Sequence, residues 1–462
     1  MKSVIRDIHL QLTSGECTCR DIVKEKISSL SENEYNSVNL LLEESAIALA
    51  DNVDAKIKAG KPIGLLEGIP FGIKDTILLQ GSVASGSSSF LKNYVSPYSA
   101  TVVQKLMEAG AIPIVKENCD SFGHGSNGEN TFYGTVKNAH DKSKAAGGSS
   151  SGSAVNVAKG YTTFSIGGDA GGALPAGFNK VYALKPAFGS LSRYGCMAND
   201  SFADGAGPIA STLEDLRILM NVMSGIDIHD NKTCPTLPIP ENIFEQAIAK
   251  QQITVGYYKN FIENKYINAS IKDAFLTMLE ALTKRGIKVI ALDSLNIETI
   301  ASAYFVLAMA EASSGFSRLD GTVYGVRSKN KNVTEGYLTT RSENFTDETK
   351  RRIIGGSLAL SREHDADVLL KARNLRMQII DDFKEDFTKV DLLLSPVSTT
   401  LPPTAGQSKD NYMSEAFTAG FALGGLPTLT APLFTPTGIQ ITANSNREDL
   451  ILTFANYLEE IG

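Results

Sequence analysis

AAGGSSSGSAVNVAKG (145–160) and SIGGDAGGALPAGF (165–178) are the two stretches that decide how this sequence is interpreted. A run of glycine and serine by itself is typical of a flexible linker. The first run, however, continues into the helix-compatible segment SAVNVAKG, where serines can cap a helix or point hydroxyls into a pocket. In the second run a turn at Ala170, Gly171 and Gly172 follows a strand pattern, and successive N–H groups in such a turn can hold an oxyanion. The context therefore favours a binding or catalytic site over a flexible linker.

The segments around these two stretches alternate between strand and helix patterns. GIPFGIKD (68–75) is a short apolar run edged by Gly and Pro, which suits a buried strand. ATVVQKLMEAG followed by AIPIVKEN (100–118) predicts a helix that ends at Gly110 and then a strand. Further strands are predicted at TTFSIGGD (162–169), ITVGYYKN (253–260), IKVIAL (287–292) and VDLLLSP (390–396). This order predicts an α/β protein with one large central sheet.

The chain has 462 residues, of which 42% are hydrophobic, and no linker divides it. We therefore expect a single domain over 1–462, made of a helical N-terminal layer (1–60), a core with the two quoted stretches (61–225) and a remainder (226–462). No apolar run approaches the roughly 18 to 20 residues that cross a bilayer, so we expect a cytoplasmic protein without membrane contact.

A net charge of −7 argues against a broad basic face for nucleic acid, so any RNA is expected to be held by another chain. The basic and polar run at 329–352 is interpreted as a solvated loop that leads into a helix. Five scattered cysteines and five dispersed histidines predict neither disulfides nor a metal site, and no cofactor is expected.

Lys74 ends the apolar string of the first predicted strand. A lysine held there loses solvation, which favours its neutral form and lets it act as a base or proton shuttle. An ordinary surface lysine is the alternative, and the residues alone leave both open.

Lys74 in GIPFGIKD and Ser149 in GGSSSGS resemble the amidase signature family, whose catalytic unit is a lysine and two serines, one of them preceded by a cis peptide. The two positions are 75 residues apart (149 − 74), the separation expected of that family, and Ser150 lies beside the second. The resemblance implies the amidase-signature fold, a large mixed sheet covered by helices on both faces.

Within that family the sequence is most similar to A subunits of tRNA-dependent amidotransferases, from SGECTCRDIV (14–23) to GIQITANSNREDLILTFANYLEE (438–460). The resemblance implies release of ammonia from glutamine for the amidation of misacylated Glu-tRNA or Asp-tRNA, with B and C subunits as partners. It matches Arg352 in KRRI and Glu415 to recognition of glutamine or another small amide. Arginine can clamp the α-carboxylate and an acidic group can hold the α-ammonium.

The similarity breaks at the turn where the family carries its nucleophilic serine. The family reads Gly-Gly-Ser, an aliphatic residue, Arg, another residue and Pro-Ala, whereas this chain continues from Gly172 with Ala173, Leu174, Pro175 and Ala176. The serine is replaced by Ala173, and two residues, including the arginine, are missing. A methyl group cannot attack a carbonyl, so the acyl-enzyme route is closed at this position.

Three functional hypotheses remain. The chain is an amidotransferase A-type subunit without an effective glutaminase, or a binding or regulatory pseudoenzyme on the amidase scaffold, or a hydrolase that uses Ser149, Ser150 or Ser151 as its nucleophile.

Overall fold

The computed structural model describes residues 2–168, 173–197, 201–202, 205–245, 253–293, 296–329, 332–361, 366–407 and 412–461. The strands in these ranges are β1 (Val38–Leu41), β2 (Pro70–Lys74), β3 (Ile112–Glu117), β4 (Phe164–Gly168), β5 (Tyr182–Lys185), β6 (Ala206–Ala210), β7 (Thr254–Tyr258), β8 (Lys288–Leu292), β9 (Leu392–Pro396), β10 (Thr428–Ala431) and β11 (Ile439–Ala443). They form one sheet in the order β1-β3-β2-β4-β6-β5-β10-β11-β9-β7-β8. The sheet is mixed, because β2 runs parallel to β3 and β4 while β4 runs antiparallel to β6.

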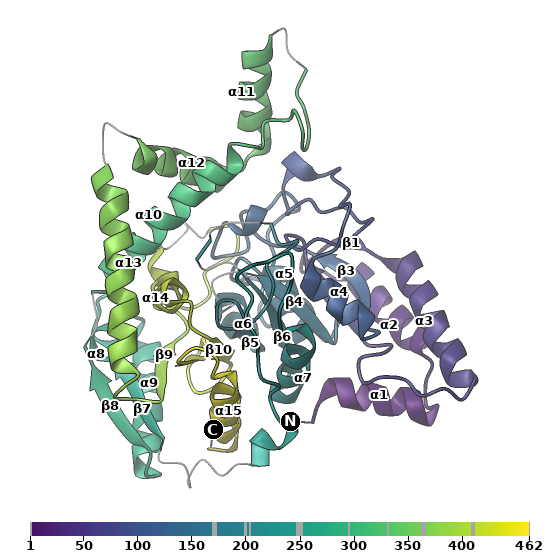
Figure 1. The fold of residues 1–462 in the computed structure, drawn as a ribbon, viewed down its shortest axis with the longest axis horizontal. Helices are drawn as coiled ribbons and strands as arrows, with labels where there is room; N and C mark the ends of the chain where they lie inside the picture. Colours follow the sequence, from purple (N-terminus) through teal and green to yellow (C-terminus); the bar gives the residue numbers. More distant parts are fainter. Residues whose placement is uncertain are drawn as a thin grey trace.

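The helices are α1 (Val4–Ser14), α2 (Cys19–Ser31), α3 (Glu43–Lys58), α4 (Thr101–Glu108), α5 (Ser151–Ala158), α6 (Ala173–Asn179), α7 (Leu213–Met223), α8 (Lys259–Ile262), α9 (Ala269–Lys284), α10 (Ile297–Phe316), α11 (Val333–Asn344), α12 (Asp347–Leu360), α13 (Ala366–Asp386), α14 (Ala416–Gly424) and α15 (Glu448–Ile461). In Figure 1, α1 to α3 lie on one side of the sheet's strands, and α10 to α13 lie on the other side and above them. The N- and C-termini lie close together below.

Helices cover both faces of the sheet, and β6 shows why. Ile209 packs with Ala154 of α5 and Ala176 of α6. Ala206 and Ala210, which lie an odd number of positions away from Ile209 along the strand, belong to the main core on the opposite face. Side chains alternate across a strand, so a run that is apolar at successive positions is buried on both faces. The predicted α/β fold with a large mixed sheet under helices on both faces is therefore confirmed.

Most strands lie where the sequence places them, since β2, β3, β4, β7, β8 and β9 fall within the predicted segments. The N-terminal 60 residues hold three helices, but β1 between α2 and α3 is not anticipated. The interpretation of 329–352 as a loop is wrong for much of its length, because α11 and the first turns of α12 occupy it. The side chain of Asn332 caps α11 by accepting from the Glu335 N–H, which supplies a start signal within that polar run.

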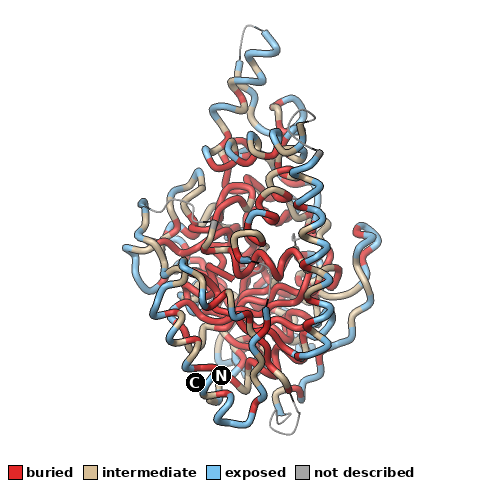
Figure 2. The backbone as a smooth tube through the Cα atoms, turned by 90° about the vertical axis from the view of Figure 1, so that its left-hand side faces the viewer, coloured by how far each residue is buried: buried red, intermediate tan, exposed pale blue. Residues whose placement is uncertain are grey.

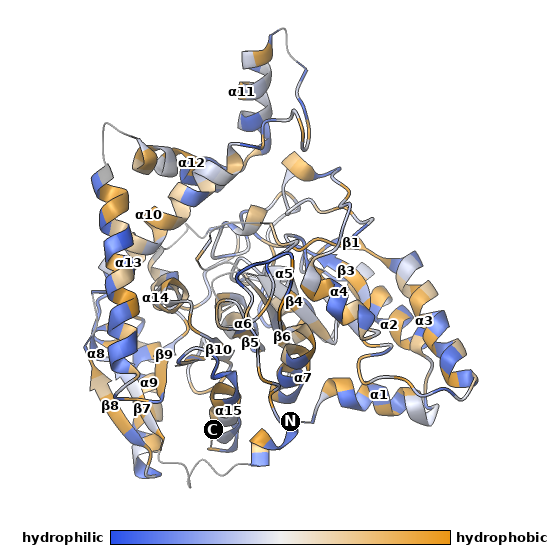
Figure 3. Cartoon of the chain, in the orientation of Figure 1, coloured by the Kyte–Doolittle hydropathy of each residue, from blue (hydrophilic) through white to orange (hydrophobic). Residues whose placement is uncertain are grey.

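Burial is concentrated in the strands and in the helices that touch them, while α11 projects with mostly exposed residues (Figure 2). Apolar residues fill the strands, whereas outer helices such as α13 alternate between apolar and polar side chains (Figure 3). Within the described ranges, no helix is long and apolar enough to cross a membrane.

Candidate functional site

Lys74 lies at the end of β2 and is completely buried. Its Nζ donates to Ser149 Oγ at 2.6 Å, to Ser150 Oγ at 3.0 Å and to the carbonyl oxygen of Gly168. A buried amine is tolerated only when its hydrogens are satisfied, so these three acceptors explain how the sheet holds this lysine. The structure therefore brings together Lys74, Ser149 and Ser150, which lie 75 and 76 positions apart in sequence.

The serine segment before α5 is held tightly by its surroundings. The Gly148–Ser149 peptide bond is cis, as the resemblance implies. A Cβ at Gly148 would overlap Asp120 Oδ2, so only glycine fits there. Asp120 in turn accepts N–H groups from Gly128 at 3.1 Å and Asn130 at 2.9 Å, and its own N–H donates to the Ser149 carbonyl. The backbone around Ser149 is therefore fixed by a buried acid and by the absence of a side chain at position 148.

A small pocket of about 40 Å³ lies against Ser149. It is lined by Gly123, Gly125, Gly148, Ser149, Ala173, Leu174, Tyr304, Arg352, Glu415 and Thr418. Four residues singled out from the sequence therefore share one pocket, although they come from the segment before α5, from α6, from α12 and from the turn before α14. Lys74 reaches the pocket indirectly, through its bond to Ser149.

The cationic wall of this pocket is Arg352. Its Nε donates to Glu348 Oε1 at 2.7 Å, one helical turn earlier in α12. Burial opposes the charged form, but the carboxylates of Glu348 and Glu415 outweigh it and raise the pKa of Arg352 above its usual value. The guanidinium thus stays charged in a buried position, where it can bind a carboxylate strongly.

Ala173 begins α6 and is 4% exposed, in a small apolar cluster with Leu174, Phe178 and Val397. The side chain that position 173 presents to the pocket is therefore a methyl group. Ala170, Gly171 and Gly172, the residues considered for the oxyanion turn, lie outside the described residues.

A buried acid lies on the strand next to that of Lys74. Glu117 of β3 is the register partner of Lys74, and its Oε1 accepts from Ser165 at 2.7 Å and from Asn156 of α5 at 3.0 Å. A Cβ at Gly72 would overlap this oxygen, so the glycine makes room for the carboxyl group. Burial raises the pKa of Glu117 to about 7. Glu117 thus links α5, and the serines before it, to the sheet through a group that titrates near neutrality.

The sequence did not single out Tyr304, Thr418, Gly123 or Gly125 as pocket residues. Tyr304 lies in an apolar helix and Thr418 in a small-residue helix, where the sequence gives them no distinguishing signal. Between the two glycines lies His124, buried edge-on against Phe316. Burial and the positive charges of Arg352 and Lys74 hold the pKa of His124 well below its usual value. No group of three or more His, Cys, Asp or Glu suited to a metal occurs among the described residues.

Comparison with known proteins agrees with this geometry. Residues 22–452 match the family model described as Amidase. The A subunit of the glutamyl-tRNA(Gln) amidotransferase of Trichodesmium erythraeum is 37% identical over 473 aligned positions, which cover 99% of this chain and 97% of that protein. The corresponding protein of Gloeothece citriformis is 36% identical, again over 99% of this chain and 97% of its own length.

Solved structures give the same result at the level of the fold. The crystal structure of the glutamyl-tRNA(Gln) amidotransferase A subunit of Thermotoga maritima superimposes with a TM-score of 0.72 at 31% identity, covering 86% of this chain and 83% of that chain. A 6-aminohexanoate cyclic dimer hydrolase is 22% identical, with a TM-score of 0.82 over 99% of this chain and 96% of that chain. At this identity the similarity supports a shared fold and nothing about function. The sheet order, the lysine–serine cluster and these similarities together lead to one conclusion: the chain belongs to the amidase signature family, with A subunits of glutamyl-tRNA(Gln) amidotransferases among its relatives.

Proposed function

We propose that this chain is an amidotransferase A-type subunit that binds glutamine or a similar small amide without hydrolysing it by the acyl-enzyme route. The observation that supports this most strongly is the composition of one pocket. It joins Arg352 and Glu415, suited to an α-amino acid, with Ser149 and with a methyl group at Ala173.

Recognition follows from the charges of the two walls. The Arg352 guanidinium offers paired N–H donors to an α-carboxylate, and its link to Glu348 fixes its orientation. Glu415 lies close enough to raise the pKa of Arg352 and would hold an α-ammonium group. A zwitterion bound between them would direct its side-chain amide toward Ser149 and Ala173.

Hydrolysis in the family needs a nucleophile at position 173 and a route that removes its proton. Groups suited to the second part are present here, because Lys74 Nζ donates a hydrogen bond to Ser149 Oγ at 2.6 Å. The first part is missing, since carbon cannot attack the amide. The size of such a loss is known from the serine protease subtilisin, where removal of the nucleophilic serine alone lowers kcat by about 2 × 10⁶.

The relatives are subunits by name, and we extend this to the present chain as part of the proposal. B and C subunits would be its partners, and any tRNA would be held by them, in keeping with the net charge of −7. A cytoplasmic location remains a prediction of the same proposal. Such an assembly would use free ammonia rather than ammonia from glutamine.

Isothermal titration calorimetry with glutamine and co-purification with B and C subunits test the proposal. We expect saturable glutamine binding without release of glutamate, together with a stable complex. Glutamine binding without any complex would favour the binding or regulatory pseudoenzyme. Absence of both binding and complex formation would refute both.

Ser149 supports a second candidate function, a hydrolase with a substituted nucleophile. It lines the pocket, and its Oγ accepts a hydrogen bond at 2.6 Å from Lys74 Nζ, so the hydroxyl lies next to an amine that could take its proton. A serine-directed phosphonate tests this: labelling that Ser149→Ala abolishes and Ser151→Ala leaves intact would support it. An unlabelled protein would exclude it.

A further inference from the structure

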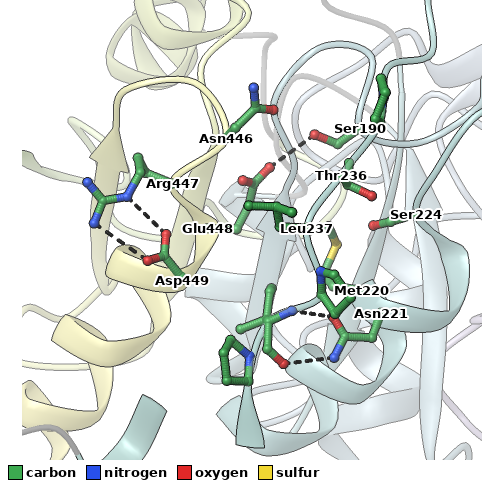
Figure 4. Close-up of a pocket in the computed structure, with 14 residues that line it drawn as sticks. Ser190, Met220, Asn221, Ser224, Thr236, Leu237, Asn446, Arg447, Glu448 and Asp449 are labelled. Atoms are coloured by element: carbon green, nitrogen blue, oxygen red, sulfur yellow. Dashed lines mark hydrogen bonds and ion pairs between the residues drawn. The ribbon is translucent and has the colours of Figure 1, made fainter.

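A second cavity, of about 540 Å³, is shown in Figure 4. It shares no lining residue with the pocket that Ser149 and Arg352 line. It lies between the second half of α7, the segment 235–240 and the start of α15. Its volume falls in the range of about 300–1,000 Å³ that is typical of small-molecule sites. The proposed function uses none of these residues.

The wall formed by 235–240 is fixed in place. Asn221 of α7 accepts the Ile239 N–H at 2.8 Å and donates to the Ile239 carbonyl at 2.9 Å (Figure 4). Arg217 donates to the same carbonyl at 3.0 Å. Because three hydrogen bonds hold this segment, this wall of the cavity is already ordered without a ligand.

Glu448, at the start of α15, brings a carboxylate into the cavity (Figure 4). The residue is only 7% exposed, and its Oε1 accepts both the Ala187 N–H at 2.9 Å and the Ser190 hydroxyl at 3.2 Å. Its Oε2 receives no hydrogen bond from the described residues. A nine-tenths buried carboxylate therefore keeps one oxygen available to a ligand.

The charges around Glu448 leave it uncompensated. Arg447 and Asp449 are the other charged residues of the lining, and they pair with each other at 3.1 Å. Within the described part of the chain, no basic side chain forms an ion pair with Glu448. A buried carboxylate without a cation favours a ligand that supplies one.

Part of the remaining wall is apolar. Three prolines, Pro235, Pro238 and Pro240, line it together with Met220 and Leu237. Leu237 is 91% exposed, so it offers apolar surface at the rim that no described residue covers. Proline rings and a thioether pack well against planar aromatic groups.

We propose that this cavity binds a small aromatic cation, with an amidinium or ammonium group at Glu448 and its ring against the proline wall. Benzamidine is the probe, because its planar cation can pair with a carboxylate through two hydrogen bonds. Benzamide, which has the same shape and no charge, is the matched ligand control. Calorimetry on the full chain should show saturable benzamidine binding and binding of benzamide weaker by at least about tenfold.

Glu448→Gln should weaken benzamidine binding by at least about tenfold, because the amide still accepts from Ala187 and Ser190 but lacks the charge. Glu460→Gln, the same change at an exposed position of the same helix, should leave binding unchanged. Ser224→Phe, which fills the cavity without touching Glu448, should abolish binding and keeps the test decisive if Glu448→Gln fails to fold. The proposal is overturned if benzamidine does not bind, if Ser224→Phe leaves its affinity unchanged, or if Glu415→Gln reduces its affinity, which would put the probe in the other pocket.

Discussion

The pocket lined by Ser149 and Ala173 has two sides, and they differ in which polar groups they present. On one side, Lys74, Ser149 and Ser150 retain a complete hydrogen-bonded cluster. On the other side, Ala173 presents a methyl group among apolar neighbours. The difference shows that a buried lysine needs its acceptors whether or not the protein hydrolyses anything. The hydrogen bonds of the lysine–serine cluster satisfy a buried lysine in any case, so the cluster is no sign of catalysis by itself.

The largest expected effect tests whether that cluster is structural. Lys74→Ala should lower the free energy of unfolding by about 3–5 kcal/mol, because it leaves a cavity and removes the donor that satisfies three buried oxygens. Chemical denaturation measures this, with Lys92→Ala at an exposed position as control. A loss below about 1 kcal/mol would break the comparison, since the cluster would then have no structural role.

Glu117 should make the free energy of unfolding depend on pH. Glu117 has a pKa of about 7 in the folded chain against an ordinary value of 4.5, so the native state keeps a proton that the unfolded chain loses. The unfolding free energy should therefore fall as pH rises from 4.5 to 7, by about 3 kcal/mol, and level off above that.

Denaturation curves of wild type and Glu117→Gln across this pH range isolate the contribution of Glu117 from that of other groups. The variant should lose this part of the slope, whereas Glu108→Gln, at an exposed position of α4, should keep it. Equal slopes in wild type and Glu117→Gln would show that folding does not raise the pKa of Glu117.

Arg352 is expected to bind glutamine although position 173 carries a methyl group. Arg352→Ala should weaken glutamine binding by about 10- to 100-fold, since it removes a buried charge-assisted contact worth about 1.5–3 kcal/mol. Arg351→Ala, the exposed neighbour that also pairs with Glu348, is the matched control in the same titration. Equal affinities of the two variants would show that Arg352 does not contact glutamine.

The smallest expected effect comes from restoring the hydroxyl alone. Ala173→Ser should raise glutamate release by less than about tenfold, because the segment that follows position 173 lacks two residues of the family pattern, including its arginine, and displacements of about 1 Å cost roughly 10² in rate. Adding the arginine-containing dipeptide to the same variant is the informative comparison. Full activity from Ala173→Ser alone would show that the shortened turn is harmless.

The sequence predicted much of the fold because its strand segments carry their own start and stop signals. GIPFGIKD and AIPIVKEN are apolar, short and bounded by Gly or polar residues, and they form β2 and β3. The strands β5 and β10 have only four residues each, and their identity depends on pairing with each other over a long sequence separation. Local patterns contain no information about such pairing.

The pocket was predicted in part for a similar reason. Ser149, Ala173, Arg352 and Glu415 carry motif context, and the structure places all four in one lining. Tyr304 lies in an apolar helix, where a tyrosine is an ordinary core residue until the fold brings it to the pocket. Glu117 follows a lysine in sequence and resembles half of a surface ion pair; only the structure shows that Gly72 makes room for it inside the sheet.

Glutamate formation from glutamine by the purified chain, alone and with B and C subunits, tests the loss of hydrolysis most directly. Ser149→Ala sets the baseline, because it removes the hydroxyl nearest to Lys74 and the remaining candidate nucleophile in the pocket lining. We predict that wild type and Ser149→Ala release glutamate at the same rate as buffer, with or without the partners. Release by the wild-type chain above the Ser149→Ala baseline would contradict the proposal and identify an active hydrolase.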